Sequence, residues 1–388
     1  MFGSTPAFTE PRHVGRPNMP DRERVLELVG EAMDRRWLSN EGPLHEAFQE
    51  RVRQITGARH CVVVANATLG IQLAARALGM EGEIIMPSFT FVGTPHAVSW
   101  IGLEPVFAEI DPRTHTLDPA AVRTAIGPRT GGIVGVHLWG RSAGAEELEA
   151  IAEEHDLPLV FDAAHALGCT RAGRPVATLG DASVISFHAT KVAGAAEGGA
   201  ILTDDAELAE RLRRMRNFGF VAFDTVEGLA TNAKMSEMNA AMGVASLERF
   251  EEFVAVNRRN YEGYVAGLQD VPGVEVIDYA DGDEHNFHYV VLEVPAAVRD
   301  PLIRVLQAER VLARRYFFPG CHRLAPYAPA GASLSATDEV AGRVVTLPTG
   351  TAMSADDVAR VCAIVRVAMA HADDVVRRLA ADPAGLGR

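Results

Sequence analysis

Lysine is almost absent from this chain, and other absences exclude several classes of protein. Among 388 residues only Lys191 and Lys234 are lysines, so nearly all of the positive charge is arginine. The net charge of −14 argues against a nucleic-acid-binding protein, because such proteins are usually basic. No apolar run approaches the ~20 residues that span a membrane, and the N-terminus shows no signal peptide. We therefore expect a cytoplasmic protein that binds neither nucleic acid nor a membrane.

Cysteine is also scarce, and its spacing excludes further kinds of site. The four cysteines form no CxxC pair, which favours reduced, buried thiols over disulfides or a zinc site: Cys61, Cys169, Cys321 and Cys362. Neither GxGxxG nor GxxxxGKS/T occurs, so the sequence supports neither a Rossmann dinucleotide site nor a P-loop. We expect no metal site.

One of the two lysines stands in unusual surroundings. Apolar residues run up to Ser186 and predict a strand, and Lys191 follows in a polar corner before Gly198 and Gly199. An ammonium group among alanines and glycines needs water or a partner. A nucleophilic amine whose pKa is lowered by burial would explain the position. A surface-loop lysine is the alternative that these residues alone leave open.

A carboxylate ends another apolar run upstream. Residues 158–162 predict a strand that ends in Asp162, with His165 shortly after it. The carboxyl end of a parallel strand is where α/β sheets bind ligands. An aspartate and a lysine at two strand ends suit pyridoxal phosphate (PLP), which needs an amine for a Schiff base and an anion at its pyridine nitrogen.

Strand and helix patterns alternate over the first 250 residues. Short apolar runs such as 61–64 and 83–87 predict strands, and amphipathic segments between them predict helices. This βαβα order predicts a mainly parallel sheet covered by helices on both faces. The segment 218–230, with three phenylalanines and two glycines, predicts a surface loop that could cover a neighbouring molecule.

We expect the chain to divide into three parts. Residues 1–20, rich in proline, glycine and arginine, predict a loose N-terminal arm. Residues 21–250 predict a large PLP-binding domain, and residues 251–388, where short strands mix with helices, predict a smaller C-terminal α/β domain. A chain of this length can bury a core in each.

Several motifs together resemble a known family. They are Pro87 to Val92, Val136 to Gly140, Phe161 to Ala166, Ser186 to Lys191 with Glu197 to Gly199, and Asn232 to Glu237. In this order they resemble the DegT/StrS family of nucleotide-sugar aminotransferases, roughly over residues 25 to 375. The resemblance implies the PLP-dependent transferase fold type I, that of aspartate aminotransferase. In it, a mainly parallel sheet lies between helices in a large domain, and a smaller C-terminal α/β domain follows.

The resemblance also implies a role for single residues around PLP. Lys191 would form the Schiff base and carry a proton, and Asp162 would pair with the protonated pyridine nitrogen. Ser186 would bind the phosphate. Phe91 would lie on one face of the ring and His165 on the other; a core aromatic and a capping histidine are the plainer alternatives.

The resemblance implies further site residues, and at some of these positions the sequence differs from the family motif. Ala67 and Thr68 would bind the phosphate at a helix N-terminus, although the family has Gly-Thr there; an ordinary helix cap is the alternative. Asn232 would reach the phosphate in the neighbouring subunit, within a motif that is usually Asn-x-Arg and has Lys234 here. His322 is a further candidate on the substrate side.

The function that the resemblance implies is a homodimeric, PLP-dependent aminotransferase with shared active sites. It would move an amino group from L-glutamate (or glutamine) to a keto sugar nucleotide, in first place dTDP-4-keto-6-deoxyglucose, in deoxyamino sugar and antibiotic biosynthesis. A C-3 keto sugar, a cyclitol ketone and a non-catalytic PLP-binding regulatory paralogue stay open as alternatives. A related sugar dehydratase is disfavoured, because those enzymes have histidine in place of the lysine at 191.

Overall fold

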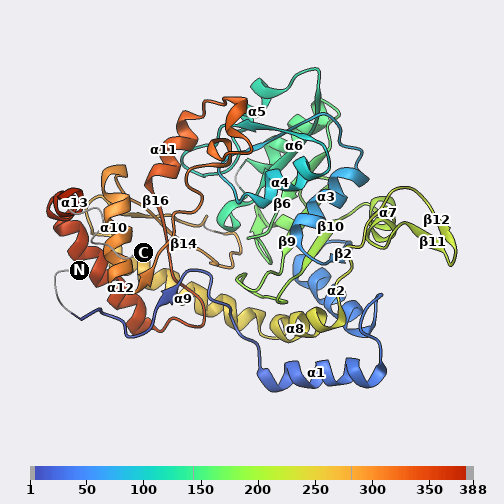
Figure 1. The fold of residues 1–388 in the computed structure, drawn as a ribbon, viewed down its shortest axis with the longest axis horizontal. Coiled ribbons are helices and arrows are strands. Elements are labelled where there is room, and N and C mark those ends of the chain that lie inside the picture. The colour runs from blue at the N-terminus through green and yellow to red at the C-terminus, as the bar shows by residue number, and fades with distance from the viewer. Residues whose placement is uncertain (1–4, 143, 281, 382–388) are drawn as a thin grey trace.

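A seven-stranded sheet forms the centre of the larger part of the chain. The computed structural model describes residues 5–142, 144–280 and 282–381 (Figure 1). The strand order is β2-β10-β9-β6-β5-β3-β4, with β2 (His60–Val64), β3 (Glu83–Pro87), β4 (Glu104–Ala108), β5 (Thr130–Val136), β6 (Leu159–Asp162), β9 (Ala182–Ser186) and β10 (Gly199–Thr203). β10 pairs antiparallel with both of its neighbours, β2 and β9, and the other strand pairs of this sheet are parallel. The prediction of a mainly parallel sheet is confirmed.

Helices cover both faces of this sheet. One face carries α3 (Ala67–Ala77), α4 (Gly93–Trp100) and α7 (Ala206–Arg216). The other carries α2 (Pro43–Thr56), α5 (Pro119–Ala125), α6 (Ala145–Glu154) and α8 (Glu237–Leu247), with α1 (Arg22–Arg35) packed on the outside of α8. Polar caps set where several of these helices begin: the side chain of Asn66, for example, accepts from the N–H of Leu69 at the start of α3.

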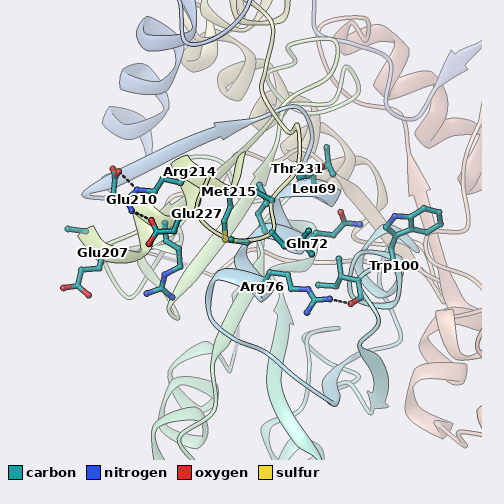
Figure 2. Close-up of a pocket in the computed structure, with 17 residues that line it drawn as sticks. Leu69, Gln72, Arg76, Trp100, Glu207, Glu210, Arg214, Met215, Glu227 and Thr231 are labelled. Atoms are coloured by element: carbon teal, nitrogen blue, oxygen red, sulfur yellow. Dashed lines mark hydrogen bonds and ion pairs between the residues drawn. The ribbon is translucent and has the colours of Figure 1, made fainter. Parts of the chain in front are cut away.

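A hairpin leaves the body of the molecule between α7 and α8. Its strands are β11 (Phe220–Ala222) and β12 (Thr225–Val226), and it reaches away from the sheet in Figure 1. Its apolar side chains are exposed, Phe223 by 96% and Leu229 by 94%. A groove of about 1050 Å³ lies between the base of the hairpin, α3, α7 and Trp100, as Figure 2 shows.

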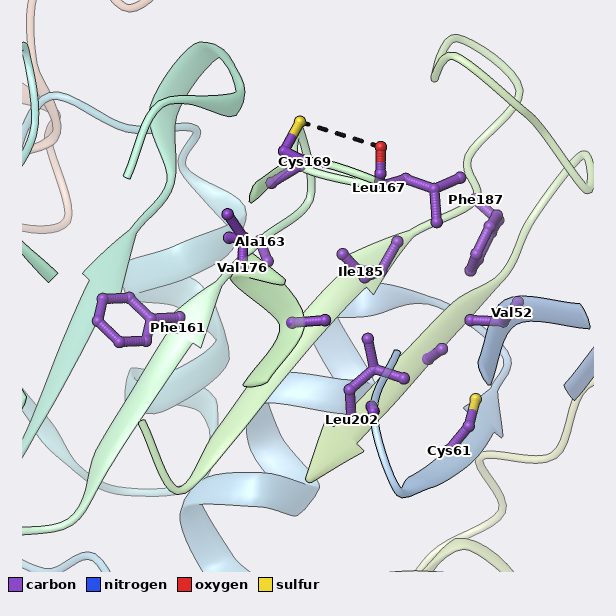
Figure 3. Packing of buried hydrophobic residues seen from close by; sticks show 14 of the residues in the cluster. Val52, Cys61, Phe161, Ala163, Leu167, Cys169, Val176, Ile185, Phe187 and Leu202 are labelled. Atoms are coloured by element: carbon purple, nitrogen blue, oxygen red, sulfur yellow. Dashed lines mark hydrogen bonds between the residues drawn. The ribbon is translucent and has the colours of Figure 1, made fainter. Parts of the chain in front are cut away.

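The core follows from the alternation of side chains along the strands. Ile85 and Leu202 belong to one apolar cluster, part of which Figure 3 shows. Their neighbours Ile84 and Ile201 belong to another cluster on the opposite face of the sheet. All five residues of β9 are buried, as are all five of β10. Such continuous apolar runs are typical of strands that are covered on both faces.

A second part follows residue 250 and has its own core. Its sheet has the order β13-β14-β16, with β13 (Glu275–Val276), β14 (Val290–Glu293) and β16 (Val344–Leu347), all antiparallel. Around it lie α9 (Phe250–Leu268), α10 (Ala296–Ala308), α11 (Ser335–Arg343), α12 (Ala355–Ala370) and α13 (Ala372–Ala381). Helix α9 joins the two parts, because Phe253 packs in the first core and Tyr264 in the second.

Short elements complete the fold. They are β7 (Thr170–Arg171), β8 (Arg174–Pro175) and the 3₁₀ turns at Leu138–Gly140, Val176–Thr178, Cys321–Arg323 and Ala328–Ala330. In the described ranges no helix is both long and apolar enough to cross a membrane. In the same ranges, no three His, Cys, Asp or Glu side chains gather where they could hold a metal ion.

The N-terminal segment differs from the expected loose arm. Phe8 is only 2% exposed and packs in the second core, and β1 (Arg12–His13) pairs in parallel with β15 (Val311–Leu312). Asn18 is buried as well. Burial of one aromatic ring and backbone pairing hold a segment whose composition alone indicates disorder. Residues 1–4 of the predicted arm lie outside the described residues.

Candidate active site

A cavity of about 300 Å³ opens at the carboxyl ends of the central strands. Its wall contains seven of the residues that the sequence analysis selected: Ala67, Thr68, Phe91, Asp162, His165, Ser186 and Lys191. The strands β6 and β9 are neighbours in the sheet and parallel, so the aspartate that ends one and the loop that follows the other meet at the same edge.

Lys191 lies in the loop after β9 and faces this cavity. Burial of the amine lowers its pKa to about 8, while the nearby Asp162 acts in the opposite direction. About a tenth of the amine is therefore neutral at pH 7, far more than for an ordinary lysine. A neutral amine is what a nucleophilic lysine needs.

Asp162 is a buried carboxylate that two donors hold in place. Its Oδ2 accepts from the hydroxyl of Thr94 at 2.7 Å, and its Oδ1 accepts from the N–H of Ala164 at 3.1 Å. Burial raises the pKa of Asp162, and the two hydrogen bonds and Lys191 oppose that rise. A buried anion with fixed geometry suits a cationic ring nitrogen.

His165 presents a neutral ring to the cavity. Its Nδ1 accepts from the backbone N–H of Trp139 at 3.3 Å, so in the neutral ring the proton is on Nε2. Burial lowers the pKa of His165 well below its ordinary value, and the charge of Lys191 adds to this. The ring is nearly parallel to those of Trp139 and Phe317, at 16° and 11°.

The start of α3 and the end of β9 form the part of the cavity that suits a phosphate. The first N–H groups of a helix have no partner within the helix and favour an anion. Thr68 and Ser186 add hydroxyl groups there. A Cβ on Gly199 would lie 2.6 Å from the carbonyl carbon of Asn66 and 2.7 Å from the nitrogen of Ala67. Glycine therefore allows β10 to lie directly against the helix start.

The structure adds wall residues that the sequence analysis did not select. Thr94 supports Asp162, and Tyr289, Tyr316 and Phe317 come from the second part of the chain. Phe91 is 60% exposed, with its ring centroid 6.4 Å from that of Phe317. No local pattern marks the three aromatic residues of the second part, because only the packing of the two parts brings them to the lysine.

Two selected residues lie elsewhere. Within the described ranges, Asn232 and His322 do not line this cavity. His322 is buried, with Nδ1 2.6 Å from the hydroxyl of Ser88 and Nε2 3.2 Å from Asp338. Its predicted contact with substrate stays untested, and its visible contacts tie the end of β3 to α11.

Asn232 is exposed at the base of the hairpin, two residues before Lys234. The ammonium group of Lys234 donates to Asn217 at 2.7 Å and lies 4.7 Å from the centre of the Phe218 ring. Lys234, which stands where the family usually has arginine, thus contacts two residues of its own chain. The predicted contact of Asn232 with a neighbouring subunit stays a prediction.

The cavity residues fit pyridoxal phosphate. Lys191 would hold the aldehyde carbon, Asp162 the pyridine nitrogen, and Thr68, Ser186 and the start of α3 the phosphate. The rings of Phe91 and His165 would enclose the pyridine. When bound, PLP supplies an electron-withdrawing ring that stabilises negative charge on a substrate carbon.

This sheet, with a lysine and an aspartate at adjacent strand ends, defines a PLP-dependent transferase of fold type I. Residues 20–366 match the DegT/DnrJ/EryC1/StrS aminotransferase family, and the chain belongs to that family. The predicted fold, cofactor and enzyme class are thereby confirmed: the protein is a PLP-dependent sugar aminotransferase.

Several known proteins are similar over nearly the whole chain. The dTDP-4-amino-4,6-dideoxy-D-glucose transaminase of Shigella dysenteriae is 32% identical over 362 residues, which are 92% of this chain and 99% of that one. A crystal structure of DesI, described in the presence of its TDP-sugar product, has 51% identity, a TM-score of 0.93 and 97% coverage of both chains. The aminotransferase TlmJ from Streptoalloteichus hindustanus is 29% identical, with a TM-score of 0.87 and coverage of 93% and 99%.

Proposed function

We propose that this enzyme transfers an amino group from L-glutamate (or L-glutamine) to C-4 of dTDP-4-keto-6-deoxyglucose. The observation that carries the proposal is the 51% identity with DesI over 97% of the chain, since DesI was crystallised with a TDP-sugar product. The Shigella relative is named for a dTDP-4-amino-4,6-dideoxy sugar, which supports the same position and sugar class. The product would be a deoxyamino sugar of the kind that antibiotics carry, made in the cytoplasm.

The cavity residues divide the chemistry between them. Lys191, with its lowered pKa, would move a proton between the carbon that bears the amino group and the cofactor's aldehyde carbon, and would move it in the opposite direction when the keto sugar is aminated. Asp162 keeps a negative charge next to the ring nitrogen. Thr94 and the N–H of Ala164 hold that carboxylate in one orientation throughout.

We also propose that two copies of the chain share their active sites. Support comes from the exposed apolar surface of the hairpin and from Trp100, which is 85% exposed at one end of the groove in Figure 2. Exposed apolar side chains that gather on one surface are typical of protein–protein interfaces. Asn232, at the base of the hairpin, would then contribute to the cavity of the second copy.

The direct test is turnover with a panel of ketones. The purified enzyme is incubated with L-glutamate or L-glutamine and, separately, with dTDP-4-keto-6-deoxyglucose, its 3-keto isomer and scyllo-inosose, and products are identified by mass spectrometry. We expect amination of the 4-keto sugar at the highest kcat/KM, and none by Lys191→Ala. A higher kcat/KM for either other ketone would overturn the substrate assignment, and no turnover with any ketone would favour the regulatory alternative.

A second candidate substrate is a C-3 ketone or a cyclitol. A relative from Micromonospora megalomicea, 33% identical over 84% of this chain, is named dTDP-3-amino-3,4,6-trideoxy-alpha-D-glucose transaminase. Another from Streptoalloteichus tenebrarius, 36% identical over 83%, is named as a putative aminotransferase of 3-amino-2,3-dideoxy-scyllo-inosose. Their identities to this chain exceed that of the Shigella protein, so the same panel must include their substrate classes.

A further inference from the structure

The loop that carries Lys191 is held by side chains from outside it. We call residues 187–198 the lysine loop. The hydroxyl of Ser246 donates to the carbonyl of Gly194 at 2.7 Å, and the amide of Asn239 donates to the carbonyls of Ala195 and Glu197, each at 2.8 Å. The bond to Gly194 is buried, and a buried carbonyl group without a strand partner needs such a donor. The position of Lys191 therefore depends on residues far from it in sequence.

Asn18 holds the same loop from the N-terminal segment. Its Nδ2 donates to the carbonyl of Val192, the residue after Lys191, at 2.9 Å within a buried contact. The segment also passes close to the residue before the lysine, because a Cβ on Gly15 would lie 3.2 Å from the side chain of Thr190. The N-terminal segment thus touches the lysine loop on both sides of Lys191.

Asn18 has a second contact that Ser246 and Asn239 do not share. Its Oδ1 accepts from the N–H of Thr351, in the second part of the chain, at 2.8 Å. A Cβ on Gly350 would lie 2.8 Å from this oxygen, so glycine leaves room for the bond. Ser246 and Asn239 instead belong to α8, which packs in the first part. One buried amide, only 6% exposed, therefore connects the lysine loop to the 349–353 turn.

The two segments that Asn18 connects lie in parts of the chain that both supply cavity residues. The lysine loop supplies Lys191, and the second part supplies Tyr289, Tyr316 and Phe317. Phe8 and the pairing of β1 with β15 fasten the N-terminal segment to that second part. A displacement of the second part would thus pull on Val192 through Asn18.

We propose that Asn18 is a positioning residue that couples the placement of Lys191 to the placement of the second part of the chain. This proposal rests on the proposed function in one respect, which is that Lys191 is the reacting amine. The amide nitrogen of Asn18 donates to the lysine loop and its oxygen accepts from Thr351, so each hydrogen bond can be removed separately.

Hydrogen exchange of the full-length protein, read by mass spectrometry, tests the coupling. In Asn18→Ala we expect exchange to increase about 2- to 10-fold in both the lysine loop and residues 349–353, the effect of one lost buried hydrogen bond. Ser246→Ala is the matched control, because it removes one bond to the same loop and should affect that loop alone. An increase confined to one segment in Asn18→Ala, or no increase, would overturn the coupling.

A variant that removes only one of the two hydrogen bonds, and the acylation rate of Lys191, complete the test. Asn18→Asp keeps the acceptor for Thr351 but places an oxygen against the carbonyl of Val192, so only the lysine loop should exchange faster. In the cofactor-free protein, the acylation rate of Lys191 is then measured against pH. In Asn18→Ala the midpoint of this profile should move to higher pH, because water that enters the lysine loop reduces the burial of the amine. An unchanged midpoint would count against a positioning role for Asn18. If Lys191→Ala still turned over, the proposed function would fail while the exchange result stood.

Discussion

At the scale of single residues, the site depends on two ionisable groups whose pKa values are shifted in opposite directions by burial. Burial lowers the pKa of Lys191 and raises that of Asp162, and each opposes the shift of the other. A larger fraction of Lys191 is thereby a neutral amine at pH 7 than of an ordinary lysine. The two donors on Asp162 orient its carboxylate and oppose the rise in its pKa that burial causes.

Replacement of Asp162 by asparagine should separate catalysis from cofactor binding. Asp162→Asn keeps Lys191, Ser186 and the start of α3, so PLP should still bind. The proton-transfer step should slow by roughly two to four decades, which corresponds to about 3–5 kcal/mol of transition-state stabilisation. Single-turnover reaction with L-glutamate at equal PLP occupancy measures this.

In the same experiment, Thr94→Val should cause a smaller loss of rate. This variant keeps the carboxylate and removes only the hydroxyl that donates to its Oδ2. A hydrogen bond to a charged group contributes about 1.5–3 kcal/mol, so a loss of roughly one to two decades is expected. An Asp162→Asn enzyme within about threefold of wild type, well under one decade, would show that Asp162 has only a structural role.

The lowered pKa of Lys191 predicts a pH dependence in the cofactor-free protein. Only the neutral amine reacts with an acylating reagent, so the rate at Lys191 should rise with pH and reach half of its limit near pH 8, where the pKa lies. Mass spectrometry can follow this peptide cleanly, because the chain has only one other lysine. In urea-unfolded protein the midpoint should move up to about 10.4, the ordinary value; a midpoint near that value in the folded protein would contradict burial of the amine.

At the scale of elements, the phosphate end of the site depends on how closely β10 approaches α3. Gly199 pairs with Val64 on one side and with Ser186 on the other, between the strand before the helix and the strand before the lysine loop. The absence of a side chain at this position sets the distance between Thr68 and Ser186.

Gly199→Ala should weaken the binding of PLP without abolishing the fold. The added Cβ would meet backbone atoms of Asn66 and Ala67, which cannot rotate away, so the start of α3 must move. Overpacking of this kind costs about 1–3 kcal/mol, or roughly 5- to 150-fold in affinity if it acts on the bound state. Fluorescence titration with PLP measures the effect. Gly30→Ala on α1, where a Cβ meets nothing within 4 Å, should leave affinity unchanged.

At the scale of the whole molecule, the exposed hairpin and Asn232 predict that two copies complete each other's sites. Neither Lys191→Ala nor Asn232→Ala alone should turn over efficiently. A mixed dimer has one site that contains Lys191 from one copy and Asn232 from the other. After free subunit exchange, an equal mixture should recover about a quarter of the wild-type activity, since half of the dimers are mixed and each has one complete site.

The control for this mixture uses two residues of one cavity. Lys191→Ala mixed with Asp162→Asn should recover nothing, because both residues line the same cavity within a single copy. If the Asn232→Ala mixture also stays inactive while subunit exchange is demonstrated by mass spectrometry, Asn232 does not serve a second copy.

The sequence by itself determined the sheet and the chemistry of its edge. Apolar runs ending in Asp162 and in Ser186 predict strand ends. Parallel strands bring their carboxyl ends to one edge, so these patterns predict that the aspartate and the lysine lie together, as they do. The βαβα order predicts helices on both faces for the same local reason. Motif resemblance added His165, Phe91 and Thr68, and all three line the cavity.

Only the tertiary structure decided which distant segments close the site. The composition of residues 1–20 predicts a loose arm, yet Asn18 within it lies against Val192 and Thr351. The wall formed by Tyr289, Tyr316 and Phe317 comes from the second part. His322, predicted on the substrate side, contacts Ser88 and Asp338 outside this cavity, and its contact with substrate stays a prediction. Periodicity reports which side of an element is buried, but not which remote segment covers it. That choice follows from side-chain packing and hydrogen bonds between residues hundreds of positions apart, which no local pattern contains.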